Sequence, residues 1–125
     1  MALLGRLLER LSRPAGETRA QHLREWVTAL DGVTPISQAK QRTRCRVAGV
    51  IRNIRIDPRQ GTGSIEATIT DGTGQMVAKW LGRASMSGIQ LGEGLIMTGT
   101  PGVGEQGELV ILNPEYELCS GPEHH

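Results

Sequence analysis

Apolar residues recur at helical spacing near the start of the chain. Five leucines within residues 2–12 fall on one face of a helix, and a second stripe built around Leu23 and Val27 runs through residues 17–30. A short amphipathic helix is only marginally stable alone in water, so these stripes need a surface to cover. Residues 1–32 are therefore predicted to form a helical extension that packs on the rest of the chain or mediates self-association.

Beyond residue 43 the hydrophobic pattern changes from helical to alternating, and β-branched residues become frequent. Alternation of this kind is typical of strands with one buried face. The predicted strands cover residues 44–56, 64–70, 75–81, 94–100 and 107–112. Gly49 lies inside the first and longest of them, where a glycine often marks a bulge that bends the strand.

The connections between these strands indicate the topology. Residues 71–74, Asp-Gly-Thr-Gly, are a hairpin signal, whereas residues 83–92 break the alternation as a crossover connection would. The arrangement predicts an all-β fold, a five-stranded OB-fold Greek-key barrel, with an SH3-like barrel as the main alternative. The predicted organisation is an N-terminal helical extension at 1–32, a connector at 33–43, the barrel at 44–118 and a C-terminal tail at 119–125.

Composition predicts an aliphatic core. Phenylalanine is absent, and the aromatic residues are two tryptophans and one tyrosine. Glycine is abundant, at 17 residues, as expected for short strands joined by tight turns.

The net charge of +1 conceals an uneven distribution. Residues 1–62 carry twelve Lys/Arg and five Asp/Glu, whereas residues 63–125 carry two and eight. The basic excess is densest around the first predicted strand, at Lys40, Arg42, Arg44, Arg46, Arg52, Arg55 and Arg59. Such a cluster is either a solvated strand face or a surface that binds phosphate.

No motif in the chain supports catalysis, a metal site or a cofactor. Residues 102–107 read G-x-G-x-x-G, but a strand follows where a dinucleotide site requires a helix, so we interpret them as a hairpin turn. Cys45 and Cys119 lack zinc-site spacing and are interpreted as two reduced thiols, with one disulfide as the alternative. His22 stands alone on a predicted helix and is expected to be a surface residue.

Three segments, DGTGQMVAKWLG, LGEGLIMTGTPG and ELVILNPEYEL, together resemble OB domains of the tRNA-anticodon and RecG-wedge type. The residues that carry the resemblance are Asp71, Gly72, Thr73 and Gly74 in the turn, Trp80 and Leu81 at a pair of large residues, Gly92, Gly94 and Gly99 in strand four, and Pro114, Glu115 and Tyr116 at the end. The chain also looks like the small stand-alone OB-fold proteins of actinobacteria. The resemblance implies a nucleic-acid-binding function, and Leu81 in place of a second aromatic residue implies reduced stacking.

OB barrels bind oligonucleotides on the face of their second and third strands. Basic side chains would contact phosphate there, and an aromatic side chain would stack on a base. The candidate nucleic-acid-binding residues are Arg44, Arg46, Arg52, Arg55, Arg59, Lys79, Trp80 and Arg83. Trp80 has an alternative place in the core, because both alternating sets of its strand are largely apolar. Glu66, Glu105 and Glu108 add negative charge, so binding is expected to be weak or to need a partner.

The sequence leaves two functions open. The first is a non-catalytic protein that binds single-stranded DNA or RNA, or branched nucleic acid. The second is a protein-interaction module that uses the barrel and the N-terminal helices for assembly. The chain has no segment of the roughly 20 apolar residues needed to span a bilayer, and a cytoplasmic location is expected.

Overall fold

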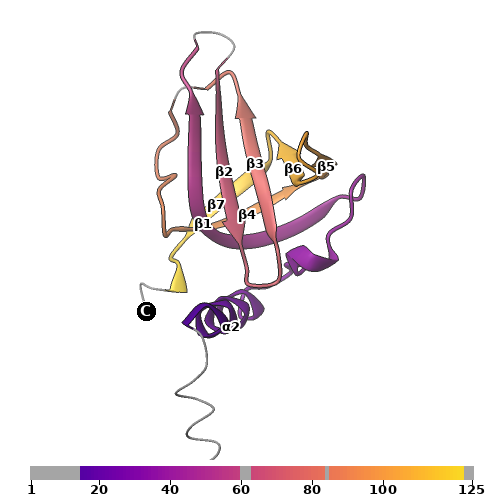
Figure 1. Ribbon diagram of the computed structural model, residues 1–125, viewed down its shortest axis with the longest axis vertical. Coiled ribbons are helices and arrows are strands. Elements are labelled where there is room, and N and C mark those ends of the chain that lie inside the picture. Colours follow the sequence, from indigo (N-terminus) through magenta and orange to yellow (C-terminus); the bar gives the residue numbers. More distant parts are fainter. Residues whose placement is uncertain (1–14, 60–62, 84, 123–125) are drawn as a thin grey trace, which may run out of the picture.

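The computed structural model describes residues 15–59, 63–83 and 85–122, and this part of the chain is mostly β-structure (Figure 1). Its elements are the helix α2 (Ala15–Thr28), the short 3₁₀ helix η1 (Ile36–Gln38) and the strands β1 (Cys45–Asp57), β2 (Ser64–Thr70), β3 (Gln75–Leu81), β4 (Gly94–Gly99), β5 (Gly102–Val103), β6 (Leu109–Leu112) and β7 (Glu115–Cys119). The helix expected over residues 2–12 lies outside the described residues. No helix among the described residues is long and apolar enough to cross a membrane.

Strand β1 belongs to two antiparallel ladders. Its first half, from Cys45, pairs with β4, and its second half pairs with β2 as far as Asp57, with Val50 present in both registers. A Cβ at Gly49 would lie 2.8 Å from the Thr70 carbonyl oxygen, so only glycine fits where β1 changes partner. The register shift lies slightly further on than expected, between Ile51 and Asn53.

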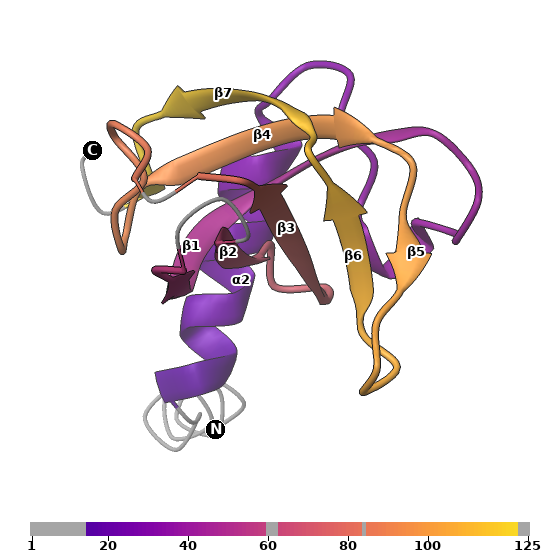
Figure 2. The same ribbon diagram turned by 90° about the horizontal axis from the view of Figure 1, so that it is seen from above.

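The strands form one seven-stranded sheet in the order β5-β6-β3-β2-β1-β4-β7. All pairings are antiparallel except that of β3 with β6. The two residues Asn113 and Pro114 connect β6 near one end of this order to β7 at the other, so the chain itself links the two ends of the curled sheet (Figure 2). The sequence predicted five strands, whereas the described residues form seven, because β5 also pairs with β6 and β7 also pairs with β4.

The core lies inside the curled sheet and is aliphatic except for Trp80. Its buried members are Ile36, Val47, Ile51, Ile65, Ala67, Ile69, Met76, Ala78, Trp80, Leu95, Met97 and Ile111. Ile36 reaches this core from the connector through η1, a short helix that no pattern in the connector predicts. The expected crossover between β3 and β4 contains no helix in its described residues 83 and 85–92.

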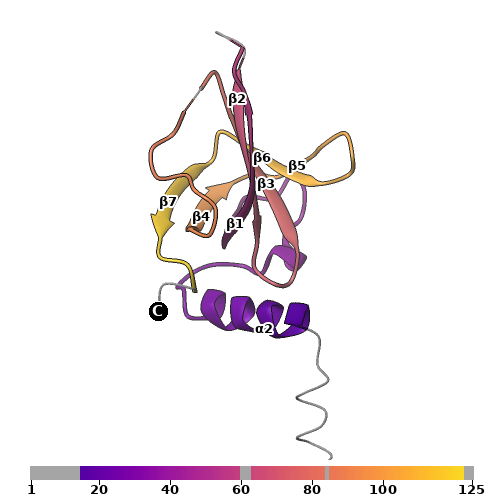
Figure 3. The same cartoon turned by 60° about the vertical axis from the view of Figure 1, so that its left-hand side comes forward.

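Helix α2 covers the opposite side of β1 (Figure 3). Ala48 and Val50 alternate with the core residues of β1, yet both are fully buried, and Leu23 and Val27 of the helix are also buried. Trp26 fixes the end of the helix, because its indole N–H donates to the Ser120 carbonyl at 3.2 Å. The apolar stripe predicted in this helix is therefore used against the chain's own sheet.

Candidate nucleic-acid interface

The side chains of β1, β2, β3 and β6 that point away from the core form one surface. We call it the outer face, and it consists of Asn53, Arg55, Asp57, Ser64, Glu66, Thr68, Val77, Lys79, Leu81, Val110 and Leu112. On β2 and β3 these residues alternate with buried ones, and they are paired across the strands, so the register places them in rows. This is the face of the second and third strands on which OB barrels bind oligonucleotides.

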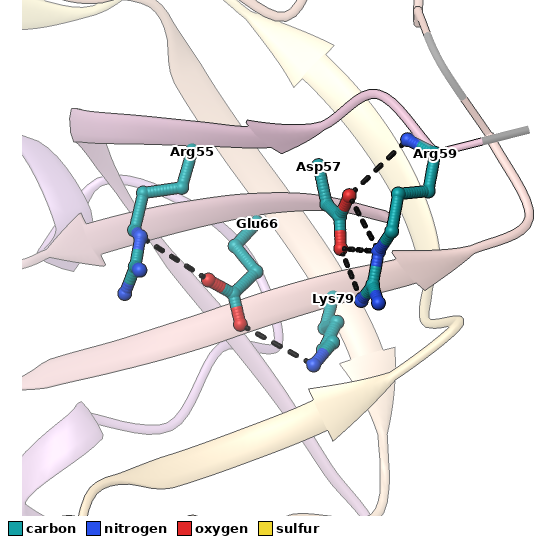
Figure 4. A network of polar contacts seen from close by, with 5 residues as sticks. All are labelled: Arg55, Asp57, Arg59, Glu66 and Lys79. Carbon is teal, nitrogen blue, oxygen red and sulfur yellow. Dashed lines mark hydrogen bonds and ion pairs between the residues drawn. The ribbon is translucent and has the colours of Figure 1, made fainter. Parts of the chain in front are cut away.

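The central row of the outer face is a three-residue charge cluster (Figure 4). Glu66 of β2 is the register partner of both Arg55 on β1 and Lys79 on β3. Its Oε2 lies 3.9 Å from Arg55 Nε, and its Oε1 lies 3.5 Å from Lys79 Nζ. The row therefore carries two cations and one carboxylate.

A second ion pair lies at the end of β1. Arg59 folds back on Asp57, with its Nη2 donating to Oδ2 at 2.7 Å and its Nε to both carboxylate oxygens. The hydrogen bond from the Arg59 side chain holds the pKa of the Asp57 carboxyl below its usual value, and the same bond raises the pKa of Arg59. The Arg59 side chain is exposed and that of Asp57 is half-buried at the surface, so the pair orders the start of the β1–β2 loop with little effect on stability.

The structure divides the predicted arginines between two regions. Arg46 lies on the half of β1 that pairs with β4, and Arg44 immediately precedes this strand. Arg44 faces Glu115 of β7 at 3.8 Å, and Arg46 faces Glu117 at 3.7 Å. Arg55, Arg59, Lys79 and Arg83 belong to the outer face or to its end, where Arg83 is exposed just beyond β3. The sequence grouped the arginines of β1 together because nothing in it showed that the strand changes partner midway.

Arg52 lies between these two regions, at the register shift of β1. It lines a hollow between α2 and the β2–β3 hairpin together with Arg19, Thr70 and Gln75. Arg52 is thus not on the outer face but beside the end of it that lies next to the β2–β3 turn.

Trp80 is a core residue, the alternative that the sequence left open for it, and its ring does not lie on the outer face. Only 3% of its surface is exposed, and its ring meets Tyr116 edge to face with centroids 5.2 Å apart. The indole N–H donates to the Pro114 carbonyl at 3.4 Å. Its alternation with Lys79 and Leu81 therefore resolves as Trp80 inside and the other two outside.

The outer face carries two exposed apolar side chains that could contact bases in place of Trp80. Leu81 and Leu112 are 50% and 57% exposed, and Leu112 is the register neighbour of Lys79. The sequence singled out Leu81 only as a missing aromatic residue and gave no role to Leu112. The alternation of the fifth strand was the available signal, because Ile111 is buried and Leu112 must then face outward.

The remaining motifs have structural places. The segment Gly102–Gly107 forms β5 and the turn to β6, closed by a bond from Gly104 N to Glu108 O at 2.8 Å, which confirms the hairpin interpretation. Cys45 and Cys119 are both free thiols, and burial raises the pKa of each. They pair with opposite ends of β4, and these two positions are too far apart for a disulfide bond. His22 is exposed, and in the described parts of the chain no three His, Cys, Asp or Glu side chains gather as metal ligands would.

The family model of the RecG wedge domain matches residues 30–124. This chain belongs to the RecG wedge domain family. The match confirms the family resemblance that the sequence motifs indicated. It also begins well before the first strand, so it takes in η1 and the connector. No curated protein sequence matches the chain significantly.

One solved structure shares the fold of this chain. A structure of RecG bound to a three-way DNA junction superimposes with a TM-score of 0.59 and 18% identity, over 72% of this chain and 13% of that chain. The chain thus has the fold of a small part of RecG and spans 13% of its length. A replication protein A heterotrimer bound to single-stranded DNA gives a TM-score of 0.49 and 20% identity, over 76% of this chain and 71% of that one. A score at that level does not define a common fold.

Proposed function

We propose that this wedge-family domain binds nucleic acid on its outer face, with single-stranded or branched DNA or RNA as the ligand. The observation that carries the proposal is the combination of Arg55 and Lys79 at the centre of that face with exposed Leu81 and Leu112 beside them. Cations of this kind contact phosphate, and apolar side chains contact bases. RecG, whose fold the chain shares in part, has been seen bound to a three-way DNA junction.

The proposed binding is weak and non-catalytic. Glu66 and Asp57 reduce the positive charge of the outer face, and its contact residues include no exposed aromatic side chain among those described. Single-strand binders gain about 1–3 kcal/mol per stacked base from aromatic residues. A partner, or a longer chain around this domain, would then supply the missing affinity. The cytoplasmic location expected from the sequence is part of the same proposal.

The fold proposed for this function is a five-stranded OB barrel. β6 and β7 would act as one fifth strand, interrupted at Pro114, which cannot donate a ladder hydrogen bond. Asn113 supports this reading, since its N–H donates to Lys79 O at 2.7 Å and its side-chain oxygen accepts the N–H of Leu81 at 3.0 Å. The fifth strand would then pair first with β3 and afterwards with β4.

Binding of fluorescently labelled DNA tests the proposed function. A three-way junction, a single strand and a duplex are titrated with the protein at about 50 mM and about 200 mM salt, and anisotropy is measured. We expect saturable binding that weakens as salt rises, with the duplex bound least. Absence of binding to all three at the lower salt would contradict the proposal.

Arg55→Gln and Arg46→Gln form a matched pair for locating the site. Each removes one arginine of β1 that faces one glutamate at a similar distance, 3.9 Å for Arg55 and 3.7 Å for Arg46. Arg55→Gln should lower the affinity and reduce the slope of log K against log salt by about 0.7 for a single strand. Arg46→Gln should leave both nearly unchanged. Equal effects of the two would show that net charge, and not the outer face, determines binding.

A role in assembly through the N-terminal helices has less support. The described helix α2 uses Leu23 and Val27 against its own sheet, so that stripe is not exposed to a partner. Residues 1–14, which carry the leucine stripe, lie outside the described residues.

A further inference from the structure

Glu66 occupies a special position on the outer face. It lies in the middle strand of the face, and each of its two carboxylate oxygens is directed to a different cation, Arg55 on one side and Lys79 on the other (Figure 4). Its side chain is 26% exposed, whereas that of Arg55 is 77% exposed. A carboxylate is therefore built into the surface at the point where phosphate has to approach.

The two contacts of Glu66 are of a kind that a phosphate can replace. At 3.5 and 3.9 Å they are longer than charge-assisted hydrogen bonds, which lie near 2.8 Å. Ion pairs on an exposed surface are also worth little in free energy. Phosphate oxygens offer the same two cations shorter contacts, and Arg55 and Lys79 are long enough to turn toward solvent.

Replacing these contacts leaves the Glu66 carboxylate without its cations. Glu66 then remains between the strands as a negative charge beside the bound phosphate. Every ligand phosphate held by Arg55 and Lys79 must be bound against this repulsion. The contacts on the β7 side differ, because there each glutamate faces one arginine, as Glu117 faces Arg46.

We propose that Glu66 limits the affinity of the outer face for nucleic-acid phosphate by competing for Arg55 and Lys79. In the unbound protein Glu66 holds both cations, and in the complex they contact phosphate instead. Glu66 is thus an affinity-determining residue that opposes binding, and this inference rests on the proposed function.

Glu66→Gln tests the competition directly. The amide keeps the shape of the side chain and removes its charge, so the fold should persist, as a thermal melt would show. Binding of the labelled single strand should become about three- to tenfold tighter at low salt, because Arg55 and Lys79 no longer have to leave a carboxylate before they contact phosphate. Unchanged or weaker binding in a folded Glu66→Gln protein would overturn the inference.

Glu117→Gln is the matched control. It makes the same chemical change in a glutamate that also faces an arginine of β1, but on the β7 side. Both variants raise the net charge by one unit, and only Glu66→Gln releases cations of the outer face. A similar gain in the control would mean that net charge alone is responsible, which would also overturn the inference. If the wild-type protein and both variants bind none of the three DNA probes, the proposed function itself fails.

Discussion

The carboxylate of Asp71 accepts the backbone N–H of Ile36 at 2.9 Å and so joins the β2–β3 turn to the connector that precedes β1. The other oxygen of Asp71 accepts three hydrogen bonds within the turn, from the N–H and hydroxyl of Thr73 and from the N–H of Gly74. Only 1% of the Asp71 surface is exposed. This charged side chain is thus fully provided with donors, as burial requires.

Removing the Asp71 carboxylate should destabilise the domain. Asp71→Ala leaves the N–H groups of Ile36 and Gly74 without their acceptor inside the protein, and the expected loss is about 2–4 kcal/mol of unfolding free energy. Urea denaturation followed by circular dichroism measures it. Asp31→Ala, at an exposed aspartate, is the control and should change stability by less than about 0.5 kcal/mol. Equal stability of the two variants would contradict the role given to Asp71.

The pair formed by Asp57 and Arg59 predicts a pH effect of known sign. The pKa of Asp57 is lowered in the folded protein, so the contribution of the pair is present above the unfolded-state pKa and is lost as pH falls through the lower, folded-state value. NMR titration of the Asp57 carboxyl in the folded protein should show a pKa below the ordinary range. In Arg59→Gln the pKa should return toward that range. An unchanged pKa in the variant would show that another group causes the shift.

Trp80 and Leu81 are adjacent in sequence, but a substitution at Trp80 should lower stability, whereas one at Leu81 should lower DNA affinity. Trp80→Phe removes the donor to Pro114 and part of a buried ring, so about 1–3 kcal/mol of stability should be lost while the folded protein still binds DNA. Leu81→Ala should scarcely change stability and should weaken DNA binding about two- to fivefold. Thermal melts and anisotropy titrations of both proteins separate the two effects. Loss of binding in a stably folded Trp80→Phe protein would show instead that Trp80 contacts the ligand.

Gly49 is predicted to tolerate no side chain. Gly49→Ala places a methyl group 2.8 Å from the Thr70 carbonyl oxygen, so β1 and β2 must separate, and about 1–3 kcal/mol should be lost. At Gly102 an added Cβ has no neighbour closer than 4.0 Å, and Gly102→Ala should be neutral or slightly stabilising. Chemical denaturation of the two alanine variants provides the comparison. A Gly49→Ala protein as stable as the wild type would mean that the strands adjust without cost.

The strands could be predicted from sequence because their pattern has a clear period. The alternation of Ile65, Ala67 and Ile69 specifies both the existence of β2 and its buried face, and the turn at 71–74 specifies its pairing with β3. The side of Trp80 could not be predicted, because both Met76 with Ala78 and Val77 with Leu81 suit a core. Contacts remote in sequence, with Pro114 and Tyr116, determine it.

The candidate site was predicted only in part, for a topological reason. Arg46 and Arg55 lie on one strand and look equivalent in the sequence, but β1 pairs with β4 at the first and with β2 at the second. No local pattern reveals which partner a residue has. Leu112 was missed for a related reason, since it reaches the outer face through the parallel pairing of β6 with β3.

The link between β6 and β7 also determines where the chain can accept extra residues. Only Asn113 and Pro114 separate β6, near one end of the strand order, from β7 at the other end. Asn113 is hydrogen-bonded to Lys79 of β3, and Pro114 to Trp80 of the same strand. An engineered insertion there would lengthen the span that holds the curled sheet together, and the two edges would be free to part. The turn between β5 and β6 carries no such constraint, because it connects neighbouring strands at an exposed tip. A tag or a fused domain therefore belongs in that turn and not in the link.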